Sequence, residues 1–198
     1  MSQRSKGAFV VLDGIDGCGK SLHSKLLTDG LKARGFNAVR TWEPSESHVG
    51  KFIQTMLMTE KIHPMVEALL FAADRYQHLQ AEILPSLESG KIVVCDRYLH
   101  SSLAYQGAQG VNVNWIKTIN DFAVKPDIVF YLDVPASVGL ARIRRKKTVL
   151  ENMEIQEKVR EKYLEFVRIG ELFLVDSNRS IEQVKGDLLK LVLERLES

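Results

Sequence analysis

Hydrophobic residues gather in five short runs along the chain, at about residues 8–13, 37–42, 91–96, 127–133 and 171–175. These runs are rich in the residue types that favour strands. Helical patterns of ten or more residues separate them. This alternation predicts an α/β fold in which helices cover both faces of a parallel sheet.

Two of the helical segments carry end signals. The first is expected to begin near Gly19 and to stop at Gly35, because a basic last turn followed by glycine is typical of a helix end. The second runs from His63 to Gly90 and contains Pro85. Proline lacks a backbone N–H, so the pattern predicts a kink or a break near Pro85.

The C-terminal part of the chain is predicted to be mainly helical. Residues 136–169 are expected to form two helices joined around residues 146–152. From Ile181 to Leu196, apolar residues recur at helical spacing, which predicts an amphipathic helix that covers the sheet. The apolar positions of this helix are Ile181, Val184, Leu188, Leu191 and Val192.

The composition predicts one α/β domain in residues 1–198. Of the 198 residues, 45% are hydrophobic, and no linker rich in proline, glycine or serine divides them. Lysine and arginine outnumber the acidic residues by 27 to 25, a formal charge of +2. This balance gives no reason to expect bulk binding to nucleic acid or to a membrane surface.

Cysteine usage and the N-terminal segment favour a cytoplasmic protein. The two cysteines, Cys18 and Cys95, form no C-x-x-C pair, unlike the cysteines of a disulfide-stapled secreted domain. Residues 1–6 lead into the first strand without the apolar stretch of a signal peptide. The longest apolar run, residues 68–73, is too short to span a bilayer.

The clearest motif follows the first predicted strand and opens the first predicted helix. Gly14, four residues, Gly19, Lys20 and Ser21 complete a Walker A phosphate-binding loop, or P-loop. Backbone N–H groups that lead into a helix N-terminus form a cradle for phosphate oxygens. Lys20 is expected on the β- and γ-phosphates and Ser21 on a magnesium ion. The alternative is a glycine-rich turn with an incidental lysine.

A second motif, DRYLHSSLAYQG at residues 96–107, directly follows the third predicted strand and resembles the signature of thymidylate kinases. Glu43-Pro44 resembles the acidic-proline loop of that family, and residues 70–75 resemble its base-binding helix. The resemblance covers essentially the whole chain. It implies a three-layer P-loop NTPase fold with strand order 2-3-1-4-5. The implied reaction is transfer of the γ-phosphoryl group of ATP to dTMP, with Mg²⁺, by a protein that is usually a homodimer.

The resemblance also assigns site residues. It implies ATP binding by Gly14, Ile15, Asp16, Gly17, Cys18, Gly19, Lys20, Ser21, Leu22, Arg142 and Asn178. It implies dTMP binding by Asp16, Glu43, Pro44, Phe71, Arg75, Arg97, Ser101, Ser102, Tyr105 and Gln106. The implied metal-binding residues are Ser21 and Asp96, and the implied catalytic residues are Lys20, Arg97, Asp16, Arg145 and Arg142.

Within this assignment, Arg97 is expected to clamp the acceptor phosphate and Phe71 to stack on thymine. Arg75 is expected to donate to a base carbonyl, and Tyr105 to pack against the deoxyribose. Structural alternatives stay open. Asp96 is also placed to cap the next helix, Arg97 to form an ion pair, and Phe71 and Tyr105 to pack in the core.

A basic run, Arg142-Ile-Arg144-Arg145-Lys146-Lys147, lies in the predicted lid at about residues 142–153. It is open to three interpretations: a solvated helix face, a nucleic-acid patch, or the source of an arginine for the leaving phosphates. Some thymidylate kinases carry that arginine in the P-loop, where this chain has Gly17, so the resemblance places it in the lid. Arg142, Arg144 and Arg145 are all candidates for it, and Arg145 is slightly favoured because it lies closest to the predicted loop.

Several positions depart from the family pattern. Asp13 stands where glutamate is usual, and Thr41-Trp42 replaces the residues that usually include an arginine before Glu43. Residues 176–180 resemble the adenine-side loop of the family, although polar residues after a strand are ordinary loop chemistry.

Other functions fit the P-loop alone. One is a kinase of the same fold that acts on dUMP, dCMP or a free deoxynucleoside. Another is a GTP-binding switch, but the chain lacks the N-K-x-D run of guanine-specific switches. A catalytically inactive scaffold is disfavoured because Lys20, Ser21, Asp96 and Arg97 are all present.

Overall fold

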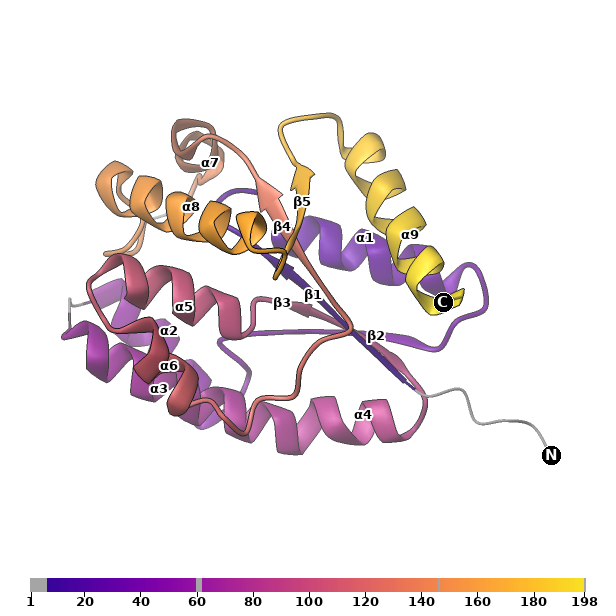
Figure 1. Ribbon diagram of the computed structural model, residues 1–198, viewed down its shortest axis with the longest axis horizontal. Coiled ribbons are helices and arrows are strands. Elements are labelled where there is room, and N and C mark those ends of the chain that lie inside the picture. The colour runs from indigo at the N-terminus through magenta and orange to yellow at the C-terminus, as the bar shows by residue number, and fades with distance from the viewer. Residues whose placement is uncertain (1–6, 60–61, 146, 198) are drawn as a thin grey trace.

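Five parallel strands form one sheet in the order β2-β3-β1-β4-β5 (Figure 1). The strands are β1 (Ala8–Asp13), β2 (Ala38–Trp42), β3 (Ile92–Asp96), β4 (Ile128–Asp133) and β5 (Phe173–Asp176). All five expected strands and their predicted order are confirmed. The last strand begins two residues later than expected.

The computed structural model describes residues 7–59, 62–145 and 147–197. Residues 1–6 and Lys146, which entered the sequence predictions, lie outside these ranges. The α-helices are α1 (Lys20–Lys32), α2 (His48–Thr59), α3 (Pro64–His78), α4 (Leu84–Glu88), α5 (Leu99–Ala108), α6 (Val113–Thr118), α7 (Ala136–Arg142), α8 (Met153–Arg168) and α9 (Ile181–Glu197). None of these described helices combines the length and apolar character needed to cross a bilayer.

The helices form layers on the two faces of the sheet. Helices α1 and α9 lie side by side on one face, and α5 packs against α8 on the other (Figure 1). The central strands are therefore covered on both sides. All six residues of β1 and all five of β3 are buried, which explains why these strands are almost continuously apolar in sequence.

The predicted break at Pro85 is confirmed as a local change of helix type. A single π-helical turn, Leu79–Ile83, joins α3 to α4, and Pro85 lies in the first turn of α4. A proline ring clashes with the carbonyl one turn earlier and offers no N–H to it, so a widened turn before Pro85 relieves the conflict.

The amphipathic prediction for α9 holds except at its first residue. Val184, Leu188 and Val192 are buried, and Leu191 packs against the core. Ile181 is wrong as a sheet-covering residue because it is 50% exposed and lies on the wall of a cavity. It starts the helix directly after the β5 loop, beyond the edge of the sheet.

Parallel pairing brings three strand ends to the same edge of the sheet. Asp96 at the end of β3 is in register with Leu12 of β1 and with Trp42 of β2. The backbone continues this alignment past the strands, because the N–H of Arg97 donates to the carbonyl of Leu12 at 2.9 Å and that of Glu43 to Asp96 at 3.0 Å. In open α/β sheets, ligands bind in the crevice at such carboxyl ends.

Candidate active site

A cavity of about 960 Å³ lies at this edge. It is bordered by the loop after β1, the ends of β2 and β3, α3, α5, the segment between α7 and α8, and the loop after β5. The predicted site residues on its wall are Asp16, Gly17, Cys18, Gly19, Lys20, Ser21, Leu22, Glu43, Pro44, Phe71, Asp96, Arg97, Ser101, Ser102, Tyr105, Gln106, Arg142 and Arg145. Four predicted residues, Gly14, Ile15, Arg75 and Asn178, are not on the wall.

The P-loop wraps around the end of β1 as the motif predicts. Gly17 has a φ of 76° and approaches α7 so closely that a Cβ atom would lie 2.0 Å from the carbonyl oxygen of Gly139. Both facts require glycine at position 17. The close approach also explains in physical terms why this chain carries no side chain there and must take any arginine for the phosphates from another segment.

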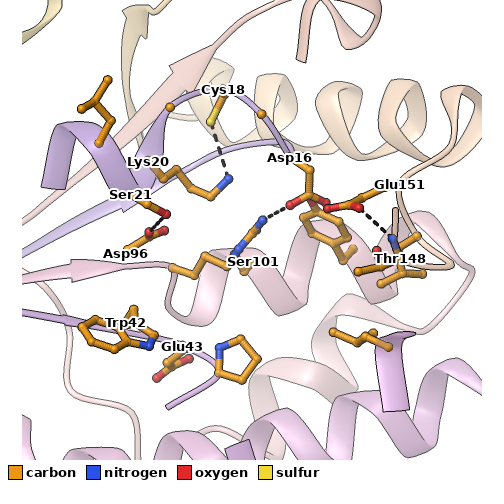
Figure 2. Close-up of a pocket in the computed structure, with 18 of the residues that line it drawn as sticks. Asp16, Cys18, Lys20, Ser21, Trp42, Glu43, Asp96, Ser101, Thr148 and Glu151 are labelled. Atoms are coloured by element: carbon orange, nitrogen blue, oxygen red, sulfur yellow. Dashed lines mark hydrogen bonds and ion pairs between the residues drawn. The ribbon is translucent and has the colours of Figure 1, made fainter. Parts of the chain in front are cut away.

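Lys20 is buried and points into the loop (Figure 2). Its Nζ donates to the carbonyls of Gly14 at 2.9 Å and Ile15 at 2.7 Å, and lies 3.6 Å from Sγ of Cys18. At the start of α1, the N-cap residue Gly19 has no capping side chain. The first-turn N–H groups and the ammonium of Lys20 therefore make this end of the cavity a place for an anion.

Ser21 and Asp96 meet at the same end (Figure 2). The hydroxyl of Ser21 donates to Oδ2 of Asp96 at 2.6 Å, and both residues line the cavity. Hydroxyl and carboxylate oxygens are hard ligands that suit Mg²⁺. Among the described residues, no group of three or more histidine, cysteine or acidic side chains is arranged so that it could hold a metal ion by itself. A pair of oxygen ligands fits a magnesium ion that takes its remaining ligands from phosphates and water.

Arg97 is the centre of a charged network in the middle of the cavity. Its Nη2 donates to Oδ1 of Asp16, and its guanidinium lies over the ring of Tyr105, 5.2 Å from the ring centroid. The hydroxyl of Tyr105 donates to Oδ2 of Asp16 at 2.8 Å, and Nε2 of Gln156 donates to the same atom at 3.0 Å. Arg97 is the one described non-glycine residue with positive φ, at 72°.

This network controls the charge of Asp16. Burial opposes ionisation of the carboxyl, but the positive charges of Arg97 and Lys20 and the hydrogen bonds from Tyr105 and Gln156 outweigh it. The pKa of Asp16 is therefore held below its usual value of 3.8. Asp16 is an anion at neutral pH, and its charge keeps the guanidinium of Arg97 in place.

A second carboxylate supports Arg97 from behind. Asp13 is fully buried, and its Oδ1 accepts hydrogen bonds from the hydroxyls of Ser101 and Tyr163, each at 2.6 Å. The Oγ of Ser101 in turn accepts from Nη1 of Arg97 at 3.2 Å. The shorter side chain of Asp13, noted as a departure from the family pattern, thus binds two hydroxyls through Oδ1, whereas its buried Oδ2 has no hydrogen-bond partner among the described residues.

The opposite side of the cavity is formed by the loop after β2 and by α3 and α5. Figure 2 shows Trp42 and Glu43 across the cavity from Lys20. Phe71 and Ser102 also line this side. Phe71 is partly exposed to the cavity, so the structure does not bury it as a core residue.

Arg75 does not reach the cavity wall. Its side chain is 1% exposed and is engaged by Glu43 at 2.8 Å, Asn120 at 2.6 Å, Ser102 at 3.2 Å and the carbonyl of Tyr98 at 3.1 Å. The physical reason is the Glu43 carboxylate, which is 2% exposed and needs a cation beside it. Direct donation from Arg75 to a base, as expected from sequence, does not match this arrangement.

The lid segment contributes two of its three described arginines to the cavity. Arg142 and Arg145 line it, whereas Arg144 is exposed and lies off its wall. Arg145 forms a bidentate pair with the buried carboxylate of Glu151, at 2.9 and 2.5 Å. Arg142 lies 3.4 Å from the carbonyl of Ser177 and 3.4 Å from Oδ1 of Asn178.

The loop after β5 reaches the cavity through neighbours of Asn178 rather than through Asn178 itself. Ser177 and Arg179 are on the wall, and the hydroxyl of Ser177 donates to the carbonyl of Cys18 in the P-loop at 2.7 Å. Asn178 is exposed and contacts the cavity only through its bond with Arg142.

Several cavity or network residues were not predicted. Gln156 on α8 is fully buried, accepts from the backbone N–H of Asp16 at 2.9 Å and donates to the carbonyl of Leu150 at 3.0 Å. Glu151 holds Arg145, and Arg40 of β2 lines the cavity. Gln156 carries no signal in the sequence, because its partner Asp16 lies 140 residues away. Glu151 lies only six residues from Arg145, but it is one of many charged residues in that segment. Arg40 carries a weak signal in the sequence, because it is a charged residue within a predicted strand.

Comparisons with known proteins agree with this geometry. A family model for thymidylate kinase matches residues 12–188. A protein of Pyrococcus horikoshii named as a probable thymidylate kinase is 42% identical over 201 residues, covering 96% of this chain and 98% of the relative. One of Thermococcus kodakarensis, named likewise, is 43% identical over 197 residues, covering 93% and 96%. The thymidylate kinase of Fervidobacterium nodosum is 38% identical over 191 residues, covering 92% and 97%.

Replacing Asp16 by asparagine should remove a pH-dependent contribution to stability. The folded-state pKa of Asp16 is lowered from 3.8, so its charge stabilises the fold above that value. This contribution is lost as the pH falls through the lower, folded-state pKa. The free energy of unfolding, measured with urea between about pH 7 and pH 3, should be larger for wild type than for Asp16→Asn near neutrality. The difference between the two proteins should shrink as the pH falls. A difference that does not change with pH would contradict the assignment.

Proposed function

This chain belongs to the thymidylate kinase family, and on that premise we propose how its residues transfer the γ-phosphoryl group of ATP to dTMP, giving dTDP and ADP. The observation that carries the proposal is the arrangement of the cavity. A phosphate-binding end with Lys20, Ser21 and Asp96 faces an acceptor wall with Glu43 and Phe71, and Arg97 lies in the middle.

The donor is proposed to bind along the P-loop. Backbone N–H groups of the loop and the first turn of α1 would surround the phosphates of ATP. Lys20 would exchange its acceptors Gly14 and Ile15 for oxygens of the β- and γ-phosphates. The approach of Arg142 to the loop after β5 supports placing the nucleoside end of ATP on that side.

Ser21 and Asp96 are proposed to hold Mg²⁺, Ser21 directly and Asp96 through water. The 2.6 Å contact between them brings their oxygen atoms to one point beside the P-loop. When bound, the ion would neutralise charge on the β- and γ-phosphates. Everything else in the transfer is assigned to this chain's own side chains.

The acceptor is proposed to lie between Arg97 and α3. Arg97 would bind the phosphate of dTMP with the planar fork of its guanidinium, and Phe71 would stack on the thymine. Tyr105 would pack against the sugar and leave little room for a 2′-hydroxyl, with Ser102 and Gln106 at the base edge. We revise the role of Arg75, which supports this wall from behind through Glu43 and Ser102.

Phosphoryl transfer depends on positioning and on neutralising charge, and it needs little covalent help from the protein. Asp16, ionised by its environment, would hold Arg97 in line with the P-loop. An arginine of the lid at residues 142–153 would neutralise the charge that develops on the leaving phosphates. We propose that residues 1–198 act as one kinase domain, because the P-loop, the acceptor wall and the lid border one cavity.

We also propose that the protein acts in the cytoplasm as a homodimer. Both cysteines are free and buried, as suits a reducing compartment, and fractionation of cells would test the location.

The surface proposed for the dimer is an apolar stripe at helical spacing on α3. It consists of Val66, Leu69 and Tyr76, which are 46%, 50% and 51% exposed. Such a stripe on a helix is a surface suited to pairing with a second copy.

The reaction is tested by ADP release from ATP and Mg²⁺ with separate acceptors: dTMP, dUMP, dCMP, dGMP, AMP, UMP, CMP and thymidine. We expect dTMP to give the highest rate, with dUMP about 10- to 200-fold lower, because one methyl group in an apolar pocket is worth only that much. Chelation of the metal and the Lys20→Met substitution should each reduce the rate to background. If dTMP gave no more ADP than the control without acceptor, the assignment would fail.

The lid arginine is tested with matched substitutions. Arg145→Met should lower kcat by about 10³-fold or more with little change in KM, because it would remove positive charge needed only during transfer. Arg144→Met is the control, since Arg144 lies outside the cavity wall, and its rate should stay near that of wild type. Arg142 is the other lid arginine on the cavity wall, and a large loss of kcat in Arg142→Met instead of Arg145→Met would assign the role to it. Wild-type rates in both Arg142→Met and Arg145→Met would refute a role for these two lid arginines.

The dimer is tested by sedimentation. Leu69→Asp places a charge in the apolar stripe on α3 and should convert the protein to a monomer. Ile169→Asp is the control, because Ile169 is 67% exposed at the end of α8, away from that stripe. Monomeric wild-type protein at micromolar concentration would rule out the proposed pairing.

A further inference from the structure

Arg40 lies on the cavity wall although it belongs to the middle of β2. Its Nε donates to Oγ of Ser24 at 2.8 Å, and its guanidinium lies 5.1 Å from the ring centroid of Trp42. Arg40 and Trp42 are two residues apart in a strand, so their side chains point to the same face. These two contacts fix the direction of the guanidinium and aim its terminal nitrogens at the end of the cavity where Asp96 lies.

The terminal nitrogens of Arg40 have capacity for an anion. Within the described part of the chain, neither Nη atom makes a hydrogen bond, and the nearest carboxylate oxygen, Oδ2 of Asp96, is 3.9 Å from Nη2. Two other arginines of the wall lie closer to a carboxylate: Arg97 contacts Asp16, and Arg179 lies 2.6 Å from Asp187. Arg40 therefore presents a planar pair of N–H groups that the protein itself leaves underused.

An ion pair with Asp96 does not account for this arrangement. Asp96 Oδ2 already accepts from Ser21 at 2.6 Å, and a structural arginine–carboxylate pair would be expected at hydrogen-bond distance and often bidentate. The side chain of Arg40 is 28% exposed, so it loses part of its hydration in the fold. Packing on the face of Trp42 offsets some of that cost and keeps the fork in one orientation.

We propose that Arg40 is a further substrate-contacting residue, whose Nη groups bind phosphate oxygens at the Asp96 end of the cavity. Trp42 is its positioning residue. The inference rests on the proposed function, because it takes nucleotide phosphates as the anions that bind there. The 5′-phosphate of dTMP and the terminal phosphate of ATP present the same oxygen chemistry, and binding measurements with each nucleotide separate these two sources.

The first test compares Arg40→Met with Arg34→Met. Arg34 is an exposed arginine after the end of α1, off the cavity wall, and its side chain donates only to the carbonyl of Gly30 among described residues, at 3.1 Å, so it controls for loss of one positive charge outside the site. Arg40→Met should lower kcat/KM by about 10- to 150-fold, the equivalent of one strong charge-assisted interaction. Arg34→Met should change it less than about twofold. Arg40→Lys keeps a point charge without the fork and should recover only part of the loss.

The second test measures binding in a Trp115→Phe background, where Trp42 is the remaining tryptophan and its fluorescence reports on the cavity. Arg40→Met should weaken binding of dTMP, or of Mg²⁺ with a non-hydrolysable ATP analogue, and the affected nucleotide identifies the phosphate. Thymidine, which has no phosphate, should bind as well as before. Equal weakening of thymidine and dTMP, or kinetics that match Arg34→Met, would overturn the proposal. If the wild-type protein itself had no dTMP kinase activity, the proposed function would be wrong, and not only the role of Arg40.

Discussion

The register of β2, β3 and β1 is the constraint on which the rest of the site depends. Because parallel strands end at the same edge, pairing of Asp96 with Leu12 and Trp42 sets the P-loop, the carboxylate proposed to hold Mg²⁺ and the proposed acceptor wall around one crevice. A shift of one residue would turn every side chain of a strand to the other face. Burial of β1 and β3 on both faces makes such a shift costly, so the position of the site is as stable as the core.

Charged groups at this edge are held by mutual neutralisation. Asp16 and Arg97, Glu43 and Arg75, and Glu151 and Arg145 each pair a sheltered carboxylate with a guanidinium. Burying one partner without the other would carry a large desolvation penalty, so each pair orders two segments of chain at once. The pairs join the P-loop to the segment between β3 and α5, the β2 loop to α3, and two parts of the lid. A rigid arrangement of charge is what phosphoryl transfer requires.

The pairs also show where the arrangement of side chains differs from what the sequence suggested. Arg75 matched a base-binding motif, yet the neighbouring Glu43 and Asn120 use its donors, because an acidic residue buried in the β2 loop has to be neutralised. Asn178 was expected to bind ATP because residues 176–180 resemble the adenine-side loop of the family. In the structure its neighbours Ser177 and Arg179 line the cavity instead. Arg40 attracted no attention as a strand residue. It reaches the cavity because Trp42, where an arginine was expected, shares its face of β2 and packs on it.

The sequence by itself determined the local features of this protein. Hydrophobic periodicity, glycine and proline positions and the two motifs are properties of neighbouring residues, so the strands, the P-loop and the break at Pro85 could all be predicted. The strand order was predicted only through the family resemblance that the motifs carry. Tertiary structure decided which charged side chains face the cavity and which serve as buried partners. Gln156 reaches Asp16, and Tyr163 reaches Asp13, across 140 and 150 residues of chain. Such contacts depend on how the layers pack and on where buried charge must be compensated, and no local pattern records either.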